Sequence, residues 1–391
     1  MSSSATAQQV STTPGMEIDS RLMLTFGGLL LIGLVMVASA SISIADRDMG
    51  EPMYYLYRQI AFAGVGLFGL SLMMILPTSI WQKLDYLWLL FAFVLLILVL
   101  IPGLGREVNG STRWLRLGFF GLQVAEPARL LILIYLASYL VRHGDEVRNK
   151  FSGFIKPMLV VSFAVLLLLL QPDFGTSTVL LATTLGMLFI AGVRLRYFLS
   201  ILAVVVAVMG YLAISSDYRL KRITGFLDPW SDAYASGYQL TQSLIAIGRG
   251  EWFGVGLGNS VQKLFYLPYA HTDCVFAVIA EEFGLFGVLI VLCLFCVLVW
   301  RAFDIGRLAS KLGQSFHAYC AFGIGIWLGA QAFINIGVNM GVLPTKGLTL
   351  PLVSSGGSSL LVTCMAVGLL LRINGELLRP TVVTKSERSK S

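Results

Sequence analysis

A carboxylate opens a long apolar segment in the stretch HTDCVFAVIAEEFG, residues 271–284. Asp273 follows His271 and Thr272 and is succeeded by seven uncharged residues, so it lies at the mouth of the helix that this segment predicts. A carboxylate in that place can act as a general base that accepts a proton from a substrate. It can also cap the helix, because Asp is a favoured N-cap residue. The residues alone leave both roles open, and the two are compatible.

Four further charges lie inside apolar segments, where an unpaired charge costs about 2.5–3.5 kcal/mol on insertion scales. Glu126 and Arg129 are three residues apart in AEPARLLIL, which makes them neighbours on one helix face. We expect an ion pair that is either structural or part of the wall of a polar cavity. Glu281 and Glu282 lie about 12 Å deeper in their helix than Asp273. We expect structural roles for both, with Glu281 facing a cavity and pairing with a buried base such as Arg129.

The stretch PTKGLTLPLVSSGGSS, residues 344–359, combines two prolines and three glycines with a single charge, Lys346. Prolines and glycines interrupt helices, and irregular backbone at membrane depth persists only where it is buried in protein or faces a cavity. We therefore expect a re-entrant loop, in which Lys346 binds phosphate or pairs with a neighbouring carboxylate.

Several other kinds of site are disfavoured. No second histidine is close to His271 in the sequence, so the HTD triplet does not predict a metal site, and the chain has no G-x-S-x-G nucleophile elbow. The glycine-rich run at 248–260 lacks the strand and helix that flank a nucleotide-binding loop, so its glycines are expected to permit tight backbone turns close to a membrane surface or a substrate. Cys293 and Cys296 lie in an apolar segment and are interpreted as packing residues. No basic patch interleaved with aromatic residues indicates a nucleic-acid partner.

The composition predicts an all-α polytopic integral membrane protein. Of the 391 residues, 57% are hydrophobic and 13% charged, whereas soluble chains carry about 25% charged residues. The mean hydropathy is +0.81. Apolar runs of roughly 17–25 residues can cross a bilayer. Ten such spans are expected, at about 21–44, 56–76, 85–101, 124–141, 156–171, 174–192, 197–215, 275–299, 316–341 and 352–373.

An even number of spans places both termini on one side of the membrane. Lys and Arg concentrate in the short loops and tails of that side, which the positive-inside rule assigns to the cytoplasm. Residues 1–20 are expected to be a disordered cytoplasmic tail. Residues 374–391 are expected to be a cytoplasmic C-terminal tail. The loop 216–274 lies on the other side, and its first part, 216–230, predicts a short helix in the membrane interface.

Stretches spread in order over residues 21–373 resemble one protein family. The run YQLTQSLIAIGRGEWFGVGLGNSVQKLFYLPYAHTDCVFAVIAEEFG, residues 238–284, resembles the signature of the SEDS family (shape, elongation, division and sporulation). NGSTRWLRLG, QPDFGT and KGLTLPLVSSGGSS resemble its other landmarks. GVGLGNSVQK and KGLTLP are more similar to the division (FtsW) branch than to the elongation (RodA) branch.

The resemblance implies a ten-helix SEDS membrane domain over residues 21–373, with a large periplasmic loop, 216–274, between the seventh and eighth helices. It implies a peptidoglycan glycosyltransferase that polymerises lipid II at the outer face of the bacterial inner membrane, at the division septum. The implied partners are a class B penicillin-binding transpeptidase (FtsI), the activating FtsQ, FtsL and FtsB complex, and membrane lipids. The essential carboxylate of the family falls on Asp273, and its acid and base at the start of the fourth helix fall on Glu126 and Arg129.

The chain departs from the family pattern beside the HTD triplet. Tyr269 stands where the family usually has a glutamate, and Cys274 stands where it has phenylalanine. Phe265 occupies a position at which many division members carry an acid. These replacements weaken any mechanism in which neighbouring acids share the chemistry or hold a divalent cation.

The implied reaction joins the 4-hydroxyl of one sugar to C1 of another with loss of undecaprenyl pyrophosphate. Asp273 is the expected general base, and a single displacement inverts the configuration at C1. The leaving group is anionic, so it requires charge neutralisation. No cofactor is required, and a divalent Mg or Mn cation at the pyrophosphate is compatible with the reaction. The candidate substrate-binding residues are His271, Lys346, Arg249, Lys263, Gln262, Arg113, Ser355 and Gly356.

Three alternatives remain open at the level of the sequence. A lipid II flippase has the same composition, but it does not require an acid at the outer mouth of a span, and it predicts two-sided access and inverted repeats. An elongation polymerase of the RodA type shares the landmarks. A non-catalytic scaffold for division proteins predicts that Asp273 is dispensable.

Overall fold

The computed structural model describes residues 19–108, 111–117, 120–215, 217–235, 237–344 and 347–378. These residues form fourteen helices and three strands. In chain order the elements are α1 (Ser20–Met49), α2 (Tyr54–Ile75), α3 (Thr78–Lys83), α4 (Asp85–Leu98), β1 (Gly105–Val108), β2 (Ser111–Leu117), β3 (Phe120–Gln123), α5 (Ala125–Arg142), α6 (Gly144–Asn149), α7 (Phe151–Leu170), α8 (Phe174–Ile190), α9 (Leu195–Ile214), α10 (Asp217–Leu227), α11 (Tyr238–Gly250), α12 (Val275–Lys311), α13 (Ser315–Asn339) and α14 (Gly357–Leu378).

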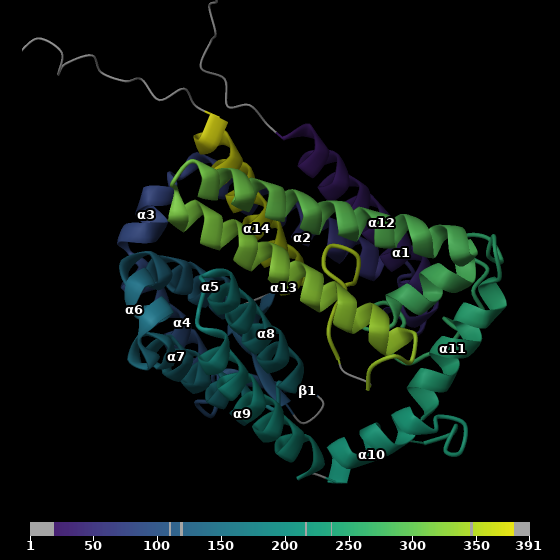
Figure 1. Ribbon diagram of the computed structural model, residues 1–391. Helices are drawn as coiled ribbons and strands as arrows, with labels where there is room; N and C mark the ends of the chain where they lie inside the picture. The colour runs from purple at the N-terminus through teal and green to yellow at the C-terminus, as the bar shows by residue number, and fades with distance from the viewer. Residues whose placement is uncertain are drawn as a thin grey trace, which may run out of the picture.

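The long helices form two groups (Figure 1). Helices α1, α2, α12, α13 and α14 lie together, with α14 packed most extensively on α2 and α12 on α13. Helices α4 to α9 form the second group, and α13 joins the two by contacting α5 and α8. Burial follows this arrangement, because 83% of the most apolar window of α14 is buried but none of the window in α9. Helix α9 therefore lies at the edge of its group and leaves much of its apolar surface exposed, as a lipid-facing helix does.

Every expected span coincides with a helix. Seven helices are long and apolar enough to cross a membrane, namely α1, α2, α7, α9, α12, α13 and α14. Two more, α4 and α8, are apolar but shorter, and α5 carries Glu126, Arg129 and Arg142. The polytopic helical fold is confirmed, while the count of ten spans stays a prediction because these three helices are short or charged.

A small antiparallel sheet adds to the all-helical fold expected from the sequence. Strands β1, β2 and β3 pair in that order within the loop 102–123, with Trp114 opposite Gln123 and Leu115 opposite Leu122. Residues of STRWLRL alternate across the sheet, and Ser111 and Arg113 line the large cavity described below. A helical bundle alone would not position these side chains there.

The loop that precedes α12 packs against a kink in that helix. Gly284 has φ 62° and ψ −158°, which interrupts the helical geometry. Two amides of the segment 250–256 donate to the exposed carbonyl oxygens of Glu281 and Glu282, each at 3.0 Å. A Cβ atom at Gly254 would lie 2.1 Å from the carbonyl oxygen of Glu282. Gly254 therefore permits a close backbone contact with the kinked helix, a partner that the sequence did not predict.

The carboxylate of Glu281 holds this loop through four donors. It accepts hydrogen bonds from the Ser260 hydroxyl, from the Val261 amide at 3.0 Å and from the Gln262 amide at 3.3 Å, and it pairs with Arg249 at 3.3 Å. The expected structural role is present, but the partner is Arg249 and not Arg129. The loop folds back over the first turns of α12, and this places Arg249 within reach.

The carboxylate of Glu282 ties the loop to α1. It accepts a hydrogen bond from the Ser39 hydroxyl at 2.7 Å and pairs with the Lys263 ammonium at 2.8 Å. Lys263 also donates to Ser39 at 2.9 Å, and all three residues are buried. A buried charge that loses its partner is strongly destabilising, so this cluster fixes the loop on both helices.

We predict that Lys263→Met lowers the free energy of unfolding by about 3–5 kcal/mol, because it leaves Glu282 buried without a cation. The double variant Lys263→Met/Glu282→Leu should recover most of that loss, since it removes both charges. Thermal unfolding of the purified protein in detergent measures both effects.

Lys156→Met is the matched control, because the Lys156 ammonium lies 3.7 Å from Glu146 with 58% of its side chain exposed. Exposed pairs contribute about 0–1 kcal/mol. A Lys263→Met protein as stable as the Lys156→Met protein would contradict the structural role of the buried pair.

Candidate functional site

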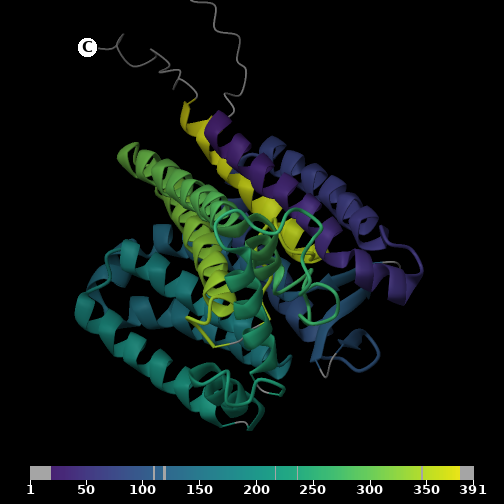
Figure 2. The same ribbon diagram turned by 90° about the vertical axis from the view of Figure 1, so that its right-hand side faces the viewer.

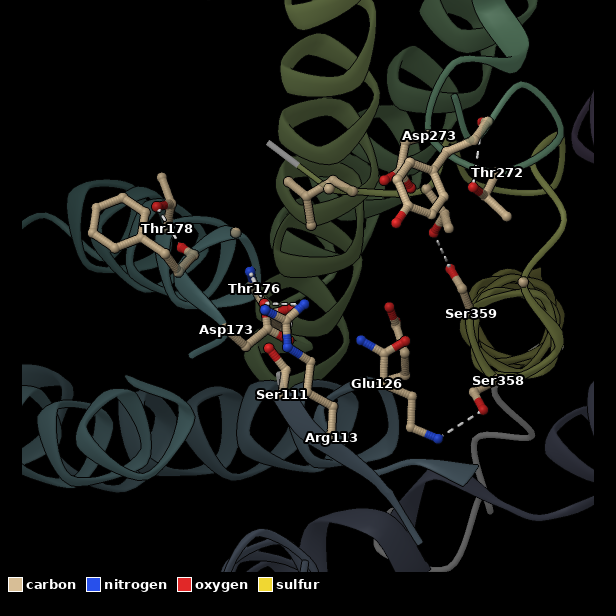
Figure 3. Close-up of a pocket in the computed structure, with 18 of the residues that line it drawn as sticks. Ser111, Arg113, Glu126, Asp173, Thr176, Thr178, Thr272, Asp273, Ser358 and Ser359 are labelled. Carbon is tan, nitrogen blue, oxygen red and sulfur yellow. Dashed lines mark hydrogen bonds and ion pairs between the residues drawn. The ribbon is translucent and has the colours of Figure 1, made fainter. Parts of the chain in front are cut away.

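A cavity of about 1850 Å³ lies where the two helix groups meet the sheet and the α13–α14 connection. Its lining comes from α2, β2, β3, α5, α8, α9, α10 and α11, from the turn 269–273 and from the segment 344–359. Figure 3 shows Asp273 and Thr272 on one wall, with Asp173, Thr176 and Arg113 on another. Residues that are far apart in the sequence thus face one space.

Asp273 belongs to a tight turn between Tyr269 and Cys274. The backbone amides of Thr272 and Cys274 donate to the carbonyl oxygen of Tyr269, at 3.1 and 3.2 Å. Tyr269 itself has φ 55°, a conformation that is uncommon for a residue with a side chain. The turn directs the Asp273 side chain into the cavity just before α12 begins.

The Asp273 carboxylate does not cap α12. Cys274 is the N-cap residue of α12, and no side chain makes a capping hydrogen bond there. Among the described residues, no donor forms a hydrogen bond with the Asp273 carboxylate. A Cβ atom at residue 347 would lie 3.0 Å from Asp273 Oδ2, so Gly347 permits the carboxylate to rest against the chain. Of the two roles left open by the sequence, the capping role is not observed.

The surroundings of Asp273 make it a base that titrates near neutral pH. Burial raises the pKa of the Asp273 carboxyl to about 6, while the positive charges of Arg222 and Arg113 act in the opposite direction. Such a group is ionised at pH 7 and accepts a proton more readily than an ordinary aspartate does.

His271 lies beside Asp273 on the same wall as a neutral ring. Burial lowers the pKa of His271 to about 4, so the imidazole carries no charge near pH 7. Its ring contacts the Tyr55 ring with 4.8 Å between centroids, and its backbone carbonyl accepts a hydrogen bond from the Ser355 amide at 2.9 Å. His271 can contact a substrate, but it cannot supply a cation.

Arg113 and Asp173 form part of another wall of the cavity. Arg113 donates to the carbonyl oxygens of Gln171 at 3.2 Å and Pro172 at 2.5 Å, and its Nη1 lies 4.0 Å from Asp173 Oδ1. Asp173 caps α8 by accepting a hydrogen bond from the Thr176 amide at 3.1 Å. Asp173 is thus the N-cap residue of α8, and Arg113 presents a positive charge to the cavity.

The ion pair between Glu126 and Arg129 forms as the spacing predicts. Glu126 lines the cavity, whereas Arg129 lies behind it with its guanidinium 4.3 Å from the centroid of the Trp327 ring. Both interpretations of the pair therefore apply, because it is buried in the helical bundle and also forms part of the cavity wall.

The segment after α13 contributes as expected where it is described. Ser355 and Gly356 line the cavity. Lys346 lies outside the described residues, so its proposed contact with phosphate stays a prediction.

Three substrate-binding candidates lie away from the cavity lining. Arg249 pairs with Glu281, and Lys263 pairs with Glu282. Gln262 is buried, and its backbone amide donates a hydrogen bond to the Glu281 carboxylate. The structure gives these residues the task of holding the loop, in place of the substrate contact expected from the sequence. The reason is that the loop turns its polar side chains toward α12 and α1.

Arg58 and Gln59 line the cavity from the start of α2 and were not predicted from the sequence. The same holds for Asn335 and Asn339, the α13 side chains that hold the turn around Asp273. One signal was present for both groups. Polar residues within or at the start of an apolar span have a specific partner or face a cavity.

The metal-ligating side chains that line the cavity are not arranged to bind a divalent cation. No group of three or more His, Cys, Asp or Glu side chains within the described ranges is arranged to hold a metal ion. Asp173 is engaged by Thr176 and Glu126 by Arg129. A hard cation needs several free oxygen ligands, and these acids do not offer them.

Comparison with known proteins extends these observations. A family model described as "Cell cycle protein", covering FtsW, RodA and SpoVE, matches residues 20–378. The chain is 57% identical over 369 residues to a protein of Thioalkalivibrio sulfidiphilus named "Probable peptidoglycan glycosyltransferase FtsW", covering 94% of this chain and 92% of that one. It is 52% identical to the protein of that name from Legionella pneumophila, covering 89% of each chain.

Solved structures agree with the sequence matches. A chain from the work "Structural coordination of polymerization and crosslinking by a peptidoglycan synthase complex" superposes with a TM-score of 0.77 at 31% identity, covering 94% of this chain and all of that one. The rod shape determining protein RodA of Thermus thermophilus superposes with a TM-score of 0.68 at 28% identity, covering 93% of this chain and 98% of that one. The chain is a multi-pass membrane protein, and it belongs to the FtsW, RodA and SpoVE family, the SEDS family.

Proposed function

We propose that this chain is a peptidoglycan glycosyltransferase that polymerises lipid II into glycan strands. The observation that carries the proposal is the Asp273 carboxylate, which faces a large cavity and serves neither as a helix cap nor in an ion pair within 4.0 Å among the described residues. The names of relatives that are more than 50% identical support the same activity. These relatives carry the division name FtsW, which favours the division branch over a RodA-type elongation enzyme.

Asp273 acts as the general base in this mechanism. The 4-hydroxyl oxygen of the acceptor sugar attacks C1 of the donor sugar, while Asp273 takes the hydroxyl proton and later releases it to water. The new C1–O4 bond forms as the bond between C1 and the pyrophosphate oxygen breaks, so undecaprenyl pyrophosphate leaves and the configuration at C1 inverts. Proton removal of this kind contributes typically about 10²–10⁴-fold to the rate.

Cations around the cavity stabilise the departing pyrophosphate. Arg113 and Arg222 line the cavity and lie close enough to influence the charge of Asp273. Preorganised positive charge of this kind stabilises negative charge as it develops in the transition state. Lys346, in the segment that follows α13, is proposed as a further phosphate ligand. The mechanism requires no cofactor, and a Mg or Mn ion would be bound mainly by the substrate pyrophosphate.

The arrangement of the chain supports the proposed location and partners. The start of α1 and the end of α14 lie at one end of the bundle, and α10 and the sheet lie at the other (Figures 1 and 2). With the first end in the cytoplasm, the cavity with Asp273 opens toward the outer face of the inner membrane at the septum. Similarity to a peptidoglycan synthase complex supports a class B penicillin-binding transpeptidase (FtsI) as partner. FtsQ, FtsL and FtsB are proposed as activators.

We expect Asp273→Asn to abolish glycan synthesis from lipid II, with a loss of about 10²–10⁴-fold in kcat. The amide keeps the size of the side chain but cannot accept the proton. The measurement is the yield of glycan strands formed by the purified chain with its transpeptidase, compared with the unsubstituted protein at equal folded concentration.

Glu51→Gln is the control, because Glu51 is an exposed carboxylate at the rim of the same cavity. It should retain most of the activity. Equal activity in the Asp273→Asn and native proteins would remove Asp273 as the base. Absence of glycan from the native complex, together with lipid II transfer across liposomes, would favour the flippase.

The pH dependence provides an independent test. Asp273 must be ionised to act, and its pKa of about 6 predicts that kcat/KM falls as the pH drops through about 6. Arg222→Gln removes a charge that lowers this pKa, so the acid limb should move to higher pH.

Arg249→Gln serves as the control for the pH profile, because Arg249 pairs with Glu281 and is not among the charges that act on Asp273. An acid limb near pH 4, the usual range of an exposed aspartate at about 3.9, would show that Asp273 is not enclosed during the reaction.

A further inference from the structure

Helix α13 carries a row of buried polar side chains at every fourth position. Trp327, Gln331, Asn335 and Asn339 are all buried, and their spacing places them on one face of the helix. The Trp327 indole donates to Gln331 at 2.9 Å, and the Gln331 amide donates to the Thr349 carbonyl at 2.9 Å. The row thus starts at the cation–π contact of Trp327 with Arg129 and continues toward the turn that holds Asp273.

The last two members of the row both bond to the backbone of Asp273. Asn335 Nδ2 donates to the Asp273 carbonyl oxygen at 2.9 Å, and Asn339 Nδ2 donates to the same oxygen at 3.0 Å. Asn335 Nδ2 donates in addition to the Leu348 carbonyl at 2.6 Å. Both asparagines therefore hold the turn on α13, and Asn335 also joins it to the chain segment that begins at Gly347.

Among the described residues, no backbone amide of α12 donates to the Asp273 carbonyl oxygen. The first backbone hydrogen bonds of α12 run from Ala277 and Val278 to the carbonyl of Cys274, one residue beyond Asp273. A buried carbonyl without a partner costs roughly 1–3 kcal/mol. The asparagines meet that requirement in place of the helix. The Oδ1 atom of Asn339 is buried without a hydrogen-bond partner among the described residues. The hydrogen bonds that its Nδ2 atom donates therefore hold this side chain in position.

A second tether acts two residues earlier in the turn. The Ser355 amide donates to the His271 carbonyl at 2.9 Å. The carbonyls of His271 and Asp273 are thus both held from the region between α13 and α14. With its backbone fixed at these two points, the Asp273 side chain is confined to the face of the turn that opens into the cavity.

We propose that Asn335 and Asn339 are positioning residues that set the place of Asp273 for proton abstraction. They act through the Asp273 backbone and the wall at residues 347–350, without touching the substrate. This inference rests on the proposed polymerase function. A misplacement of about 1 Å at a reacting group can cost about 10²-fold in rate, so the effect falls on kcat and leaves substrate binding intact.

The test compares Asn335→Leu and Asn339→Leu with the native chain in complex with its transpeptidase. Leucine keeps the number of side-chain heavy atoms and the branching of asparagine, and it removes the hydrogen-bond donors. We expect kcat for lipid II polymerisation to fall by about 10- to 100-fold with KM within about twofold. Hydrogen–deuterium exchange should rise at the amides of residues 269–274 and stay unchanged in α1 and α14.

Asn374→Leu is the matched control, because Asn374 is a buried asparagine of α14 away from the turn. It should leave kcat and the exchange of residues 269–274 unaltered. An equal loss of kcat in Asn374→Leu, or a rise in KM with unaltered exchange at the turn, would overturn the positioning role. Full activity in both α13 variants would overturn it as well.

Two features keep the result interpretable. Within the described part of the chain, the Asn339 side chain forms hydrogen bonds only with the Asp273 carbonyl and with Asn335 of the same helix. The variant Asn339→Leu therefore carries the test if Asn335→Leu does not accumulate. The exchange measurement does not need activity. An inactive native complex would contradict the polymerase function, whereas unaltered exchange in both variants would contradict the positioning role alone.

Discussion

A helical bundle in a lipid bilayer cannot leave buried polar groups to water, and this constraint organises the whole structure. The charged groups of α12 obey it by turning inward to the loop that precedes the helix. The Glu281 carboxylate accepts hydrogen bonds from two amides and a hydroxyl and pairs with Arg249. The Glu282 carboxylate pairs with Lys263 and accepts a hydrogen bond from Ser39. The loop is consequently fixed on two helices before it reaches the turn that bears Asp273. The kink at Gly284 belongs to the same arrangement, because it exposes carbonyl groups that the loop amides satisfy.

The same constraint separates the backbone of Asp273 from its side chain. Its carbonyl oxygen accepts two hydrogen bonds from α13, whereas its carboxylate meets the cavity with distant arginines as its main electrostatic neighbours. A carboxylate with a close ion-pair partner would have a depressed pKa and would be a poor base. A rigid backbone with an unpaired side chain is the combination that a general base needs, because position is secured without neutralising the charge.

The sequence was sufficient for the helical class, the approximate spans, the pair of Glu126 with Arg129 and the place of Asp273 just before a long apolar helix, because each follows from periodicity, local spacing or a contiguous motif. It was insufficient where the answer depends on which elements meet. The sequence predicts Lys263 and Arg249 to be free cations in an outer loop. Their partners, Glu282 and Glu281, become their neighbours only when the loop folds back onto α12. Asn335 lies 62 residues from Asp273 in the chain, so no local pattern joins them. The sheet at residues 105–123 was also overlooked, since its strands are four to seven residues long.

The departures from the family pattern point to chemistry by one acid. Tyr269 stands in place of a glutamate and lines the cavity. Its backbone carbonyl accepts the hydrogen bonds that form the turn. Phe265 replaces another acid, and its ring lies 4.3 Å from the Arg47 guanidinium, away from the cavity lining. Cys274 is buried and accepts a hydrogen bond from Gln239. None of the three replacements puts a charge near Asp273. In the proposed reaction the arginines that line the cavity stabilise the pyrophosphate, and Asp273 is the single proton acceptor. The turn and α13 hold its backbone at the cavity wall.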